Sequence, residues 1–178
     1  MEYKNKKRNL WPLKAFVLAF VLTVVFSLLS EVVLTDANLI FSIIVLVIFL
    51  LVALLCDLIG VAVTACDKVP FLSMASRKIK GAKCSLWLIN NQSKVASFFG
   101  DIIGDISAII TGAIGVGIAF SLAQNTDWNS LAITIIISSL LAAFTVGCKA
   151  LVKLYAIKHS HSIVKIVGRI FLMFGLGK

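Results

Sequence analysis

The stretch NLIFSIIVLVIFLLVALLCDLIGVAVTA (residues 38–65) indicates the fold class, because it is long and apolar and carries a single charged residue, Asp57. A helix that crosses a bilayer needs about 20 predominantly apolar residues. The whole chain has the same character, since 60% of its 178 residues are hydrophobic, whereas soluble domains usually contain about 45–50%. The sequence therefore predicts an integral membrane protein.

Three other windows are long and apolar enough to span a bilayer, at about 11–30, 95–121 and 130–148. We therefore predict an all-α, polytopic membrane protein: one domain of four transmembrane helices over residues 1–178. Two further segments, 66–94 and 149–175, mix basic with apolar residues in the way that is typical of helices lying along a membrane surface.

Positive charge is distributed unevenly between the connections. The chain has 17 Lys and Arg, and none of them falls in 31–37 or 122–129, the segments that follow the first and third windows. Under the positive-inside rule, both termini and the segment 66–94 face the cytoplasm of a multi-pass cell-membrane protein. The net charge of +9 then lies beside the anionic lipid bilayer, so a nucleic-acid partner is not expected.

The cytoplasmic segments are expected to be helical. In 66–94 we predict two short amphipathic helices divided at Gly81. Residues 149–175 are predicted to form a basic interfacial helix that is broken near His159–Ser162, rather than a fifth span. The charges at Lys153, Lys158, Lys165 and Arg169 would be costly in the middle of a bilayer.

Three aspartates, Asp57, Asp101 and Asp105, lie inside the predicted spans. Asp101 and Asp105 are four residues apart, so on a helix they share one face, with about 6 Å between their Cβ atoms. Counted along the helices, all three carboxylates lie about 10–16 Å deep. We expect them to meet at one level, with Ser97 on the same face and Thr64 about two turns from Asp57. No Lys or Arg is expected deep enough to neutralise them.

Three converging carboxylates would repel one another. Either some of them are protonated, because burial and like charge raise the pKa of a carboxyl group, or a cation holds them together. Oxygen ligands suit a hard ion such as Mg²⁺, so the candidate metal ligands are Asp57, Asp101, Asp105, Ser97 and Thr64. A structural interpretation stays open, since a helix N-terminus favours an acid such as Asp101 and Asp57 could reach towards the surface.

The sequence contains no Ser–His–Asp or Cys–His set, no Gly-rich phosphate loop and no zinc-spaced residues, so an enzyme is not expected. His159 and His161 are flanked by basic residues, which is typical of a solvated or lipid-facing patch. Small residues recur at every fourth position of two spans, at Gly100, Gly104, Ala108 and Gly112 and again at Ser139, Ala143 and Gly147. Such stripes let helices approach closely, and we predict a homodimer packed through them.

Residues 57–115 resemble the membrane domain shared by the CNNM (cyclin M) and CorB/CorC magnesium transporter proteins. In that family a span ends in a motif like F-F-S-x-x-E-x-A-L-T-S, a basic segment of short helices follows, and the next span contains G-N-N-x-x-N. Here CDLIGVAVTA (56–65) takes the first place and GDIIGD (100–105) the second. The first and last asparagines of the family motif fall on Asp101 and Asp105, and its serine falls on Asp57.

The resemblance implies a dimeric domain that binds Mg²⁺ at these positions, together with backbone carbonyls. This chain departs from the family pattern: the family's glutamate falls on Gly60, the fourth span carries no acid, a first span is added and no CBS pair is present. Carboxylates in place of amides also make the site more negative.

We therefore expect a membrane transporter or permeation pathway for a divalent cation, with Mg²⁺ as the first candidate. The alternative is a non-transporting partner or scaffold protein, whose intramembrane acids are protonated or hydrogen-bonded to neighbouring helices. Proton-linked carriage of another solute is a third interpretation.

Overall fold

The computed structural model describes residues 11–34, 38–124 and 130–173, and these residues form helices joined by short connections. The elements are α1 (Trp11–Leu34), α2 (Leu39–Ala65), α3 (Val69–Ser76), α4 (Ala82–Asn90), α5 (Gln92–Ala96), the π-helix η1 (Ser97–Gly104), α6 (Asp105–Gln124), α7 (Ser130–Lys158) and α8 (Ser160–Met173). No strand occurs within the described ranges, so the predicted all-α class is confirmed.

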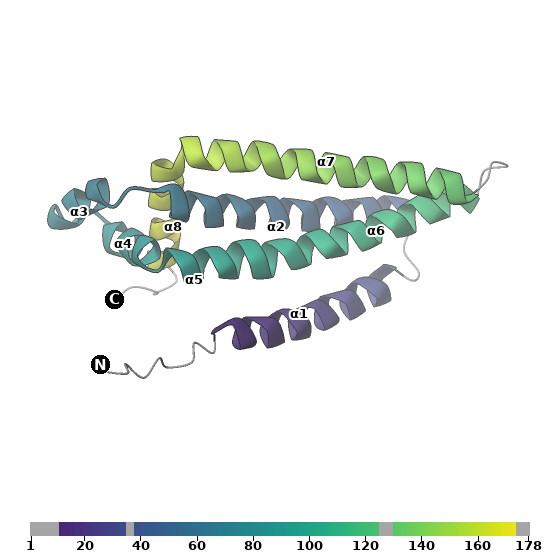
Figure 1. The fold of residues 1–178 in the computed structure, drawn as a ribbon, viewed down its shortest axis with the longest axis horizontal. Helices are drawn as coiled ribbons and strands as arrows, with labels where there is room; N and C mark the ends of the chain where they lie inside the picture. The colour runs from purple at the N-terminus through teal and green to yellow at the C-terminus, as the bar shows by residue number, and fades with distance from the viewer. Residues whose placement is uncertain (1–10, 35–37, 125–129, 174–178) are drawn as a thin grey trace, which may run out of the picture.

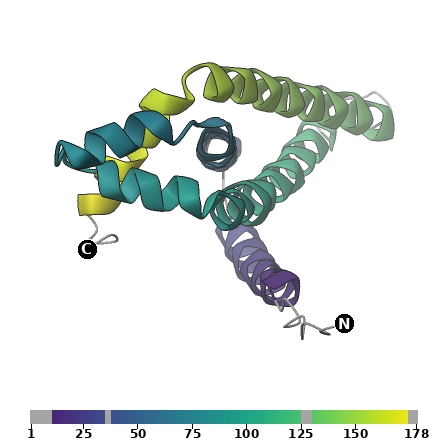
Figure 2. The same cartoon turned by 60° about the vertical axis from the view of Figure 1, so that its left-hand side comes forward.

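The helix α2 is the centre of the long bundle (Figure 1). It packs against η1 and α6 and also against α7, and Figure 2 shows it nearly end-on between α7 and the α5–α6 segment. Isoleucines spaced four residues apart lie along one face of the η1–α6 segment. Together with Leu46 of α2 they form one buried cluster, against which Ala19 and Leu22 of α1 also pack. The isoleucines are Ile102, Ile106, Ile110, Ile114 and Ile118.

Within the described residues, three helical stretches, rather than the predicted four, are long and apolar enough to cross a membrane: Leu39–Ala65, Gln92–Gln124 and Leu131–Lys158. The first predicted window does form a helix, α1, which packs on η1 and α6. Among its described residues, however, the apolar stretch is Phe16–Leu28, which is shorter than a span needs. Length and composition therefore make the described helices compatible with a membrane protein of three spans.

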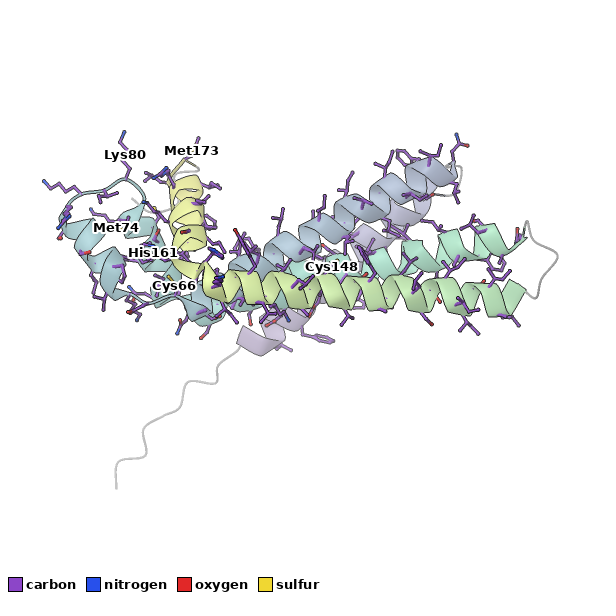
Figure 3. All side chains as sticks on the ribbon, turned by 90° about the horizontal axis from the view of Figure 1, so that it is seen from above. Cys66, Met74, Lys80, Cys148, His161 and Met173 are labelled. Atoms are coloured by element: carbon purple, nitrogen blue, oxygen red, sulfur yellow. The ribbon has the colours of Figure 1, made fainter. Side chains whose placement is uncertain are left out.

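One helix continues across residue 148, where the sequence predicted the end of a span. The helix α7 continues through Lys149 and ends at Lys158, because nothing in the sequence of this stretch breaks a helix. The break predicted near His159–Ser162 is confirmed, since His159 separates α7 from α8. Figure 3 shows α8 turned away from the axis of α7, with Met173 at its far end.

The helices α3, α4 and α8 gather at one end of the bundle (Figure 1). We call this unit the basic end (residues 68–90 and 159–173). Phe71, Leu88 and Val164 are fully buried in it, and the Ser85 hydroxyl donates a hydrogen bond of 3.1 Å to the Val164 carbonyl oxygen, which joins α4 to α8. Gly81 separates α3 from α4 with φ of +87°, a conformation that glycine adopts at little cost. The two short helices predicted around Gly81 are thus confirmed.

Candidate functional site

Asp57 is a buried carboxylic acid in the middle of the bundle. It lies eight residues before the end of α2, or about 12 Å along the helix, and 6% of the residue is exposed. Its Oδ1 atom faces the backbone of η1 at two glycines. A Cβ atom added to Gly104 would lie 3.1 Å from this oxygen, and one added to Gly100 would lie 3.9 Å from it. Because the two glycines have no side chain, the carboxylate can lie directly against the backbone of the neighbouring helix.

The segment opposite Asp57 is π-helical rather than α-helical. The η1 segment covers Ser97–Gly104, and the Asp105 N–H donates to the Gly100 carbonyl oxygen, five residues earlier. The α2 helix also approaches the backbone of η1 at Gly60, where an added Cβ atom would lie 3.5 Å from the Gly100 nitrogen. Segments of π-helix are rare and occur frequently at functional sites.

Lys149 of α7 reaches the acids, which corrects the expectation that no basic side chain would lie deep enough. Its Nζ atom is 3.3 Å from Asp57 Oδ2 and 3.3 Å from Asp105 Oδ1. Side-chain exposure is 18% for Lys149, 7% for Asp57 and 62% for Asp105. With both carboxylates ionised and Lys149 protonated, the three groups sum to a charge of −1. One ammonium group therefore bridges two acids from different helices.

The two contacts of Lys149 are not equivalent. Its ammonium group donates a hydrogen bond to Asp105, whereas the Oδ2 atom of Asp57 is buried without a hydrogen-bond partner among the described residues. A buried acceptor that lacks a hydrogen bond costs about 1–3 kcal/mol. The contact between Lys149 and Asp57 is thus an electrostatic one that leaves this oxygen incompletely satisfied.

Hydropathy alone could not predict that Lys149 lies beside the acids, because a charged residue ends an apolar window. The signal that could have predicted it is the helical character of the sequence after Lys149, which continues to Lys158. Lys149 lies nine residues before the end of α7, and Asp57 lies eight residues before the end of α2. Both helices run towards the basic end (Figure 1), so these counts place the two side chains at nearly the same level.

The other three predicted ligands, Asp101, Ser97 and Thr64, are not part of this bridge. Ser97 donates a hydrogen bond of 2.9 Å to Asp101 Oδ2, as their shared face suggested, and Asp101 is exposed. Thr64 donates to carbonyl oxygens of its own helix, at Gly60 and Val61. In the described ranges, no group of three or more His, Cys, Asp or Glu side chains is placed to hold a metal ion.

Some glycines of the predicted small-residue stripes pack against the chain itself, and others have open space beside them. Gly104 packs against its own chain, while Cβ atoms on Gly112 and Gly147 would meet nothing within 4 Å. Gly104 is therefore not available as a contact between copies. A homodimer stays a prediction, and Gly112 and Gly147 are the glycines of the stripes with room for a partner.

Histidine and cysteine side chains take part in packing near the basic end. The Tyr155 and His159 rings stack with centroids 4.4 Å apart, and the His161 ring lies 4.6 Å from that of Phe71. Burial raises the pKa of the Cys66 thiol; a hydrogen bond with Ser160 opposes this, and the nearby charge of Asp67 adds to it. The Cys66 thiol therefore stays protonated at neutral pH, which makes it a poor nucleophile.

Comparison of the chain with protein-family models, with curated proteins and with solved structures gives no match. The resemblance to the CNNM and CorB/CorC membrane domain therefore rests on the two sequence motifs and their spacing.

Proposed function

We propose that the protein is a membrane transporter for a cation, with Mg²⁺ as the first candidate, and that Asp57, Asp105 and Lys149 form its ion-exchange centre. The observation that carries the proposal is the buried Asp57 carboxylate, whose Oδ2 atom lies 3.3 Å from Lys149 Nζ and has no hydrogen bond to any residue that the structure describes. Ionisable side chains are costly within a membrane and commonly mark ion pathways. An acid whose charge is compensated but whose oxygen is unsatisfied can exchange its partner at low cost.

In this proposal Lys149 and the transported ion compete for the same two carboxylates. Lys149 supplies one positive charge, whereas Mg²⁺ in its place neutralises both acids and uses their oxygen atoms as ligands. The ammonium group sits on a flexible four-carbon stem, so it can withdraw when the ion enters and return when the ion leaves. The pair formed by Asp101 and Ser97 adds oxygen atoms on the exposed approach to the centre.

We also propose that this centre lies within the cell membrane, with both termini and the basic end on the cytoplasmic side. The three long apolar helices support a membrane location. The concentration of Lys and Arg at one end of the bundle supports the orientation.

The second candidate is a non-transporting partner or scaffold protein. The bridge itself favours it, because one lysine already contacts both carboxylates and links α2, α6 and α7. In this reading the triad fixes the packing of three helices and binds no ion.

Ion flux into proteoliposomes tests the proposal. Purified full-length protein is reconstituted, and the influx of Mg²⁺, Mn²⁺, Co²⁺ and Na⁺ is followed separately with fluorescent indicators in the lumen. We expect Mg²⁺ flux in the wild type and at least a tenfold reduction in Asp57→Asn, since loss of a metal-supporting group commonly costs about 10–100-fold. Asp67→Asn is the matched control, because Asp67 is an exposed acid beyond the end of α2 and should leave the flux unchanged.

A thermal-shift titration with MgCl₂ separates the two candidates without a transport assay. An ion that binds only the folded protein raises its melting temperature by mass action, and Asp105→Asn should weaken this shift. The absence of a shift and of flux for every ion, with increased stability of the Asp57→Asn/Lys149→Gln double variant, would establish the scaffold candidate instead.

A further inference from the structure

The basic end has an excess of positive charge that nothing in its own sequence balances. Residues 68–90 and 159–173 contain seven Lys and Arg and no Asp or Glu. Among the Lys and Arg side chains that the structure describes, only Lys149 lies within ion-pair distance of a carboxylate, and it belongs to the bundle. The positive charges of the basic end therefore repel one another unless an anion from outside this unit compensates them.

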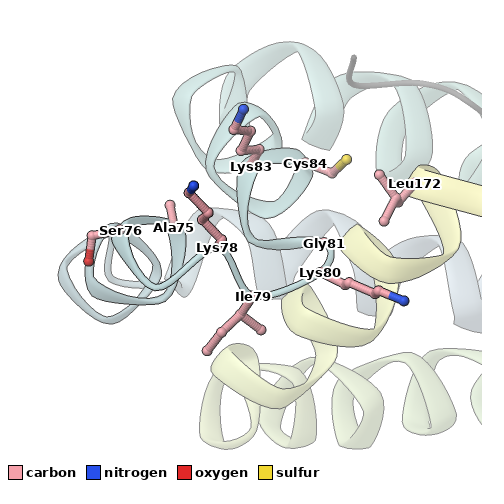
Figure 4. Close-up of a pocket in the computed structure, with 9 residues that line it drawn as sticks. All are labelled: Ala75, Ser76, Lys78, Ile79, Lys80, Gly81, Lys83, Cys84 and Leu172. Atoms are coloured by element: carbon pink, nitrogen blue, oxygen red, sulfur yellow. The ribbon is translucent and has the colours of Figure 1, made fainter.

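Part of this charge surrounds a pocket of about 440 Å³ between α3, α4 and the end of α8. Lys78, Lys80 and Lys83 line it together with Ser76, and Leu172 forms an apolar wall. Figure 4 shows Lys78 and Lys83 extending on the same side of the turn, while Lys80 extends in another direction.

The backbone of the turn holds these lysines close together. Lys78 has a positive φ of 54° and Gly81 one of 87°, so the chain reverses within a few residues and enters α4 at Ala82. The Ser85 N–H donates to the Gly81 carbonyl oxygen at 2.9 Å, and Gly81 packs against the backbone of Arg169 in α8. The turn that carries the lysines is therefore held by α4 through a hydrogen bond and by α8 through packing.

We propose that this pocket binds the phosphate group of a phosphomonoester, with Lys78 and Lys83 as the principal contacts. A phosphomonoester carries close to two negative charges at neutral pH, which matches the two ammonium groups that share one side of the pocket. Charge-assisted hydrogen bonds from lysine to phosphate are roughly twice as strong as neutral ones. The first turn of α4 contains no acidic residue to oppose an anion. This inference is independent of the proposed cation transport.

The phosphate can belong to a lipid headgroup or to a soluble compound. Basic pockets beside the membrane recognise anionic headgroups, and the apolar wall at Leu172 suits the glycerol or acyl part of a lipid. A soluble phosphate would use the ammonium groups alone. The chemistry recognised is the same, and the experiment distinguishes the two sources.

The test measures the melting temperature of the full-length protein in a neutral detergent at constant ionic strength. One arm adds dihexanoyl phosphatidic acid, a second adds dihexanoyl phosphatidylcholine, and a third adds sodium phosphate. We expect phosphatidic acid to raise the melting temperature and phosphatidylcholine to have no effect. A rise with phosphatidic acid alone identifies a lipid source, and an equal rise with sodium phosphate identifies a soluble one.

Charge-matched variants locate the site. Lys78→Gln/Lys83→Gln should weaken the apparent affinity at least tenfold, while Lys78→Arg/Lys83→Arg should retain binding. Lys68→Gln/Lys94→Gln removes the same charge from exposed positions that do not line the pocket, and should bind as the wild type does. If the two Gln double variants lost the same apparent affinity, the binding would depend only on general surface charge, and the proposal would be overturned. The lack of any shift with phosphatidic acid or phosphate would also overturn it.

Discussion

At Asp57, a glycine and a lysine provide what a buried carboxylate requires. A carboxylate in a tightly packed bundle needs space and a counter-charge, because an uncompensated buried ion costs several kcal/mol. Gly104 supplies the space, since it leaves Oδ1 of Asp57 against bare backbone, and Lys149 supplies the charge at 3.3 Å. The carboxylate is still not fully satisfied, because its Oδ2 atom lacks a hydrogen bond within the described part of the chain.

Lys149→Gln should destabilise the protein by about 3 kcal/mol, because it leaves Asp57 buried without a counter-charge. Adding Asp57→Asn should restore most of this loss, since a neutral amide needs no cation. Thermal unfolding of the purified variants in detergent measures both effects. Lys153→Gln, one turn further along α7 at an exposed position, is the control and should melt as the wild type does. A melting temperature for Lys149→Gln equal to that of the wild type would refute the bridge.

Gly104→Ala should destabilise the protein by about 1–3 kcal/mol, the usual cost of overpacking. Its new Cβ atom would lie 3.1 Å from Asp57 Oδ1 and 3.1 Å from the Phe99 carbonyl oxygen. Gly100→Ala is the matched control, because its nearest such contact is 3.9 Å and alanine favours a helix by up to about 1 kcal/mol over glycine. The prediction fails if the two alanine variants unfold at the same temperature.

At the scale of the elements, apolar window length and turn residues predicted most of the helices. The described part of α2 matches its window, and Gly81 divides α3 from α4 as expected. The π-helix η1 could not be predicted, because its residues are as apolar as those of an α-helix and the difference lies only in which carbonyl each N–H reaches. The bridge from Lys149 to Asp57 and Asp105 could not be predicted either, because it requires that α7 continue beyond residue 148.

Gly168→Ala should loosen the basic end. An added Cβ atom would meet the Ser85 hydroxyl and would lie 2.9 Å from the Ser85 nitrogen and 3.0 Å from the Gly81 carbonyl oxygen. The helix α8 must then move away from α4, and the peptide bonds that follow nearby Lys and Arg residues become more accessible to trypsin. Limited proteolysis should show faster cleavage of this variant. Gly117→Ala, where nothing lies within 4 Å of an added Cβ, should be cleaved at the wild-type rate.

At the scale of the whole molecule, charge divides the chain into two ends. The acid-free basic end lies at one end of the bundle, while the end of α6 and the beginning of α7 lie at the other (Figure 1). Sequence alone predicted this polarity, since Lys and Arg counts need no knowledge of packing. The number of spans was not predictable in the same way, because α1 is helical without a described apolar stretch of full length.

The orientation predicts opposite labelling of two introduced cysteines. All four native cysteines are free, so the test begins from a variant in which they are replaced by serine. Ser76→Cys, in the basic end, should be protected from a membrane-impermeant maleimide added to intact cells. Thr126→Cys, in the connection outside the described residues, should react. The reverse pattern would invert the proposed topology.

The π-helical segment has a consequence for the rotational register of the helix that contains it. A wider turn takes up more residues than an α-helical one, so η1 acts as an insertion within the continuous stretch Gln92–Gln124. Each residue of an α-helix advances about 100° around the axis. If a residue that the wider turn takes up were wound as regular α-helix instead, it would rotate α5 by about 100° relative to α6. The faces that now meet α2 on either side of Asp57 could then no longer do so together.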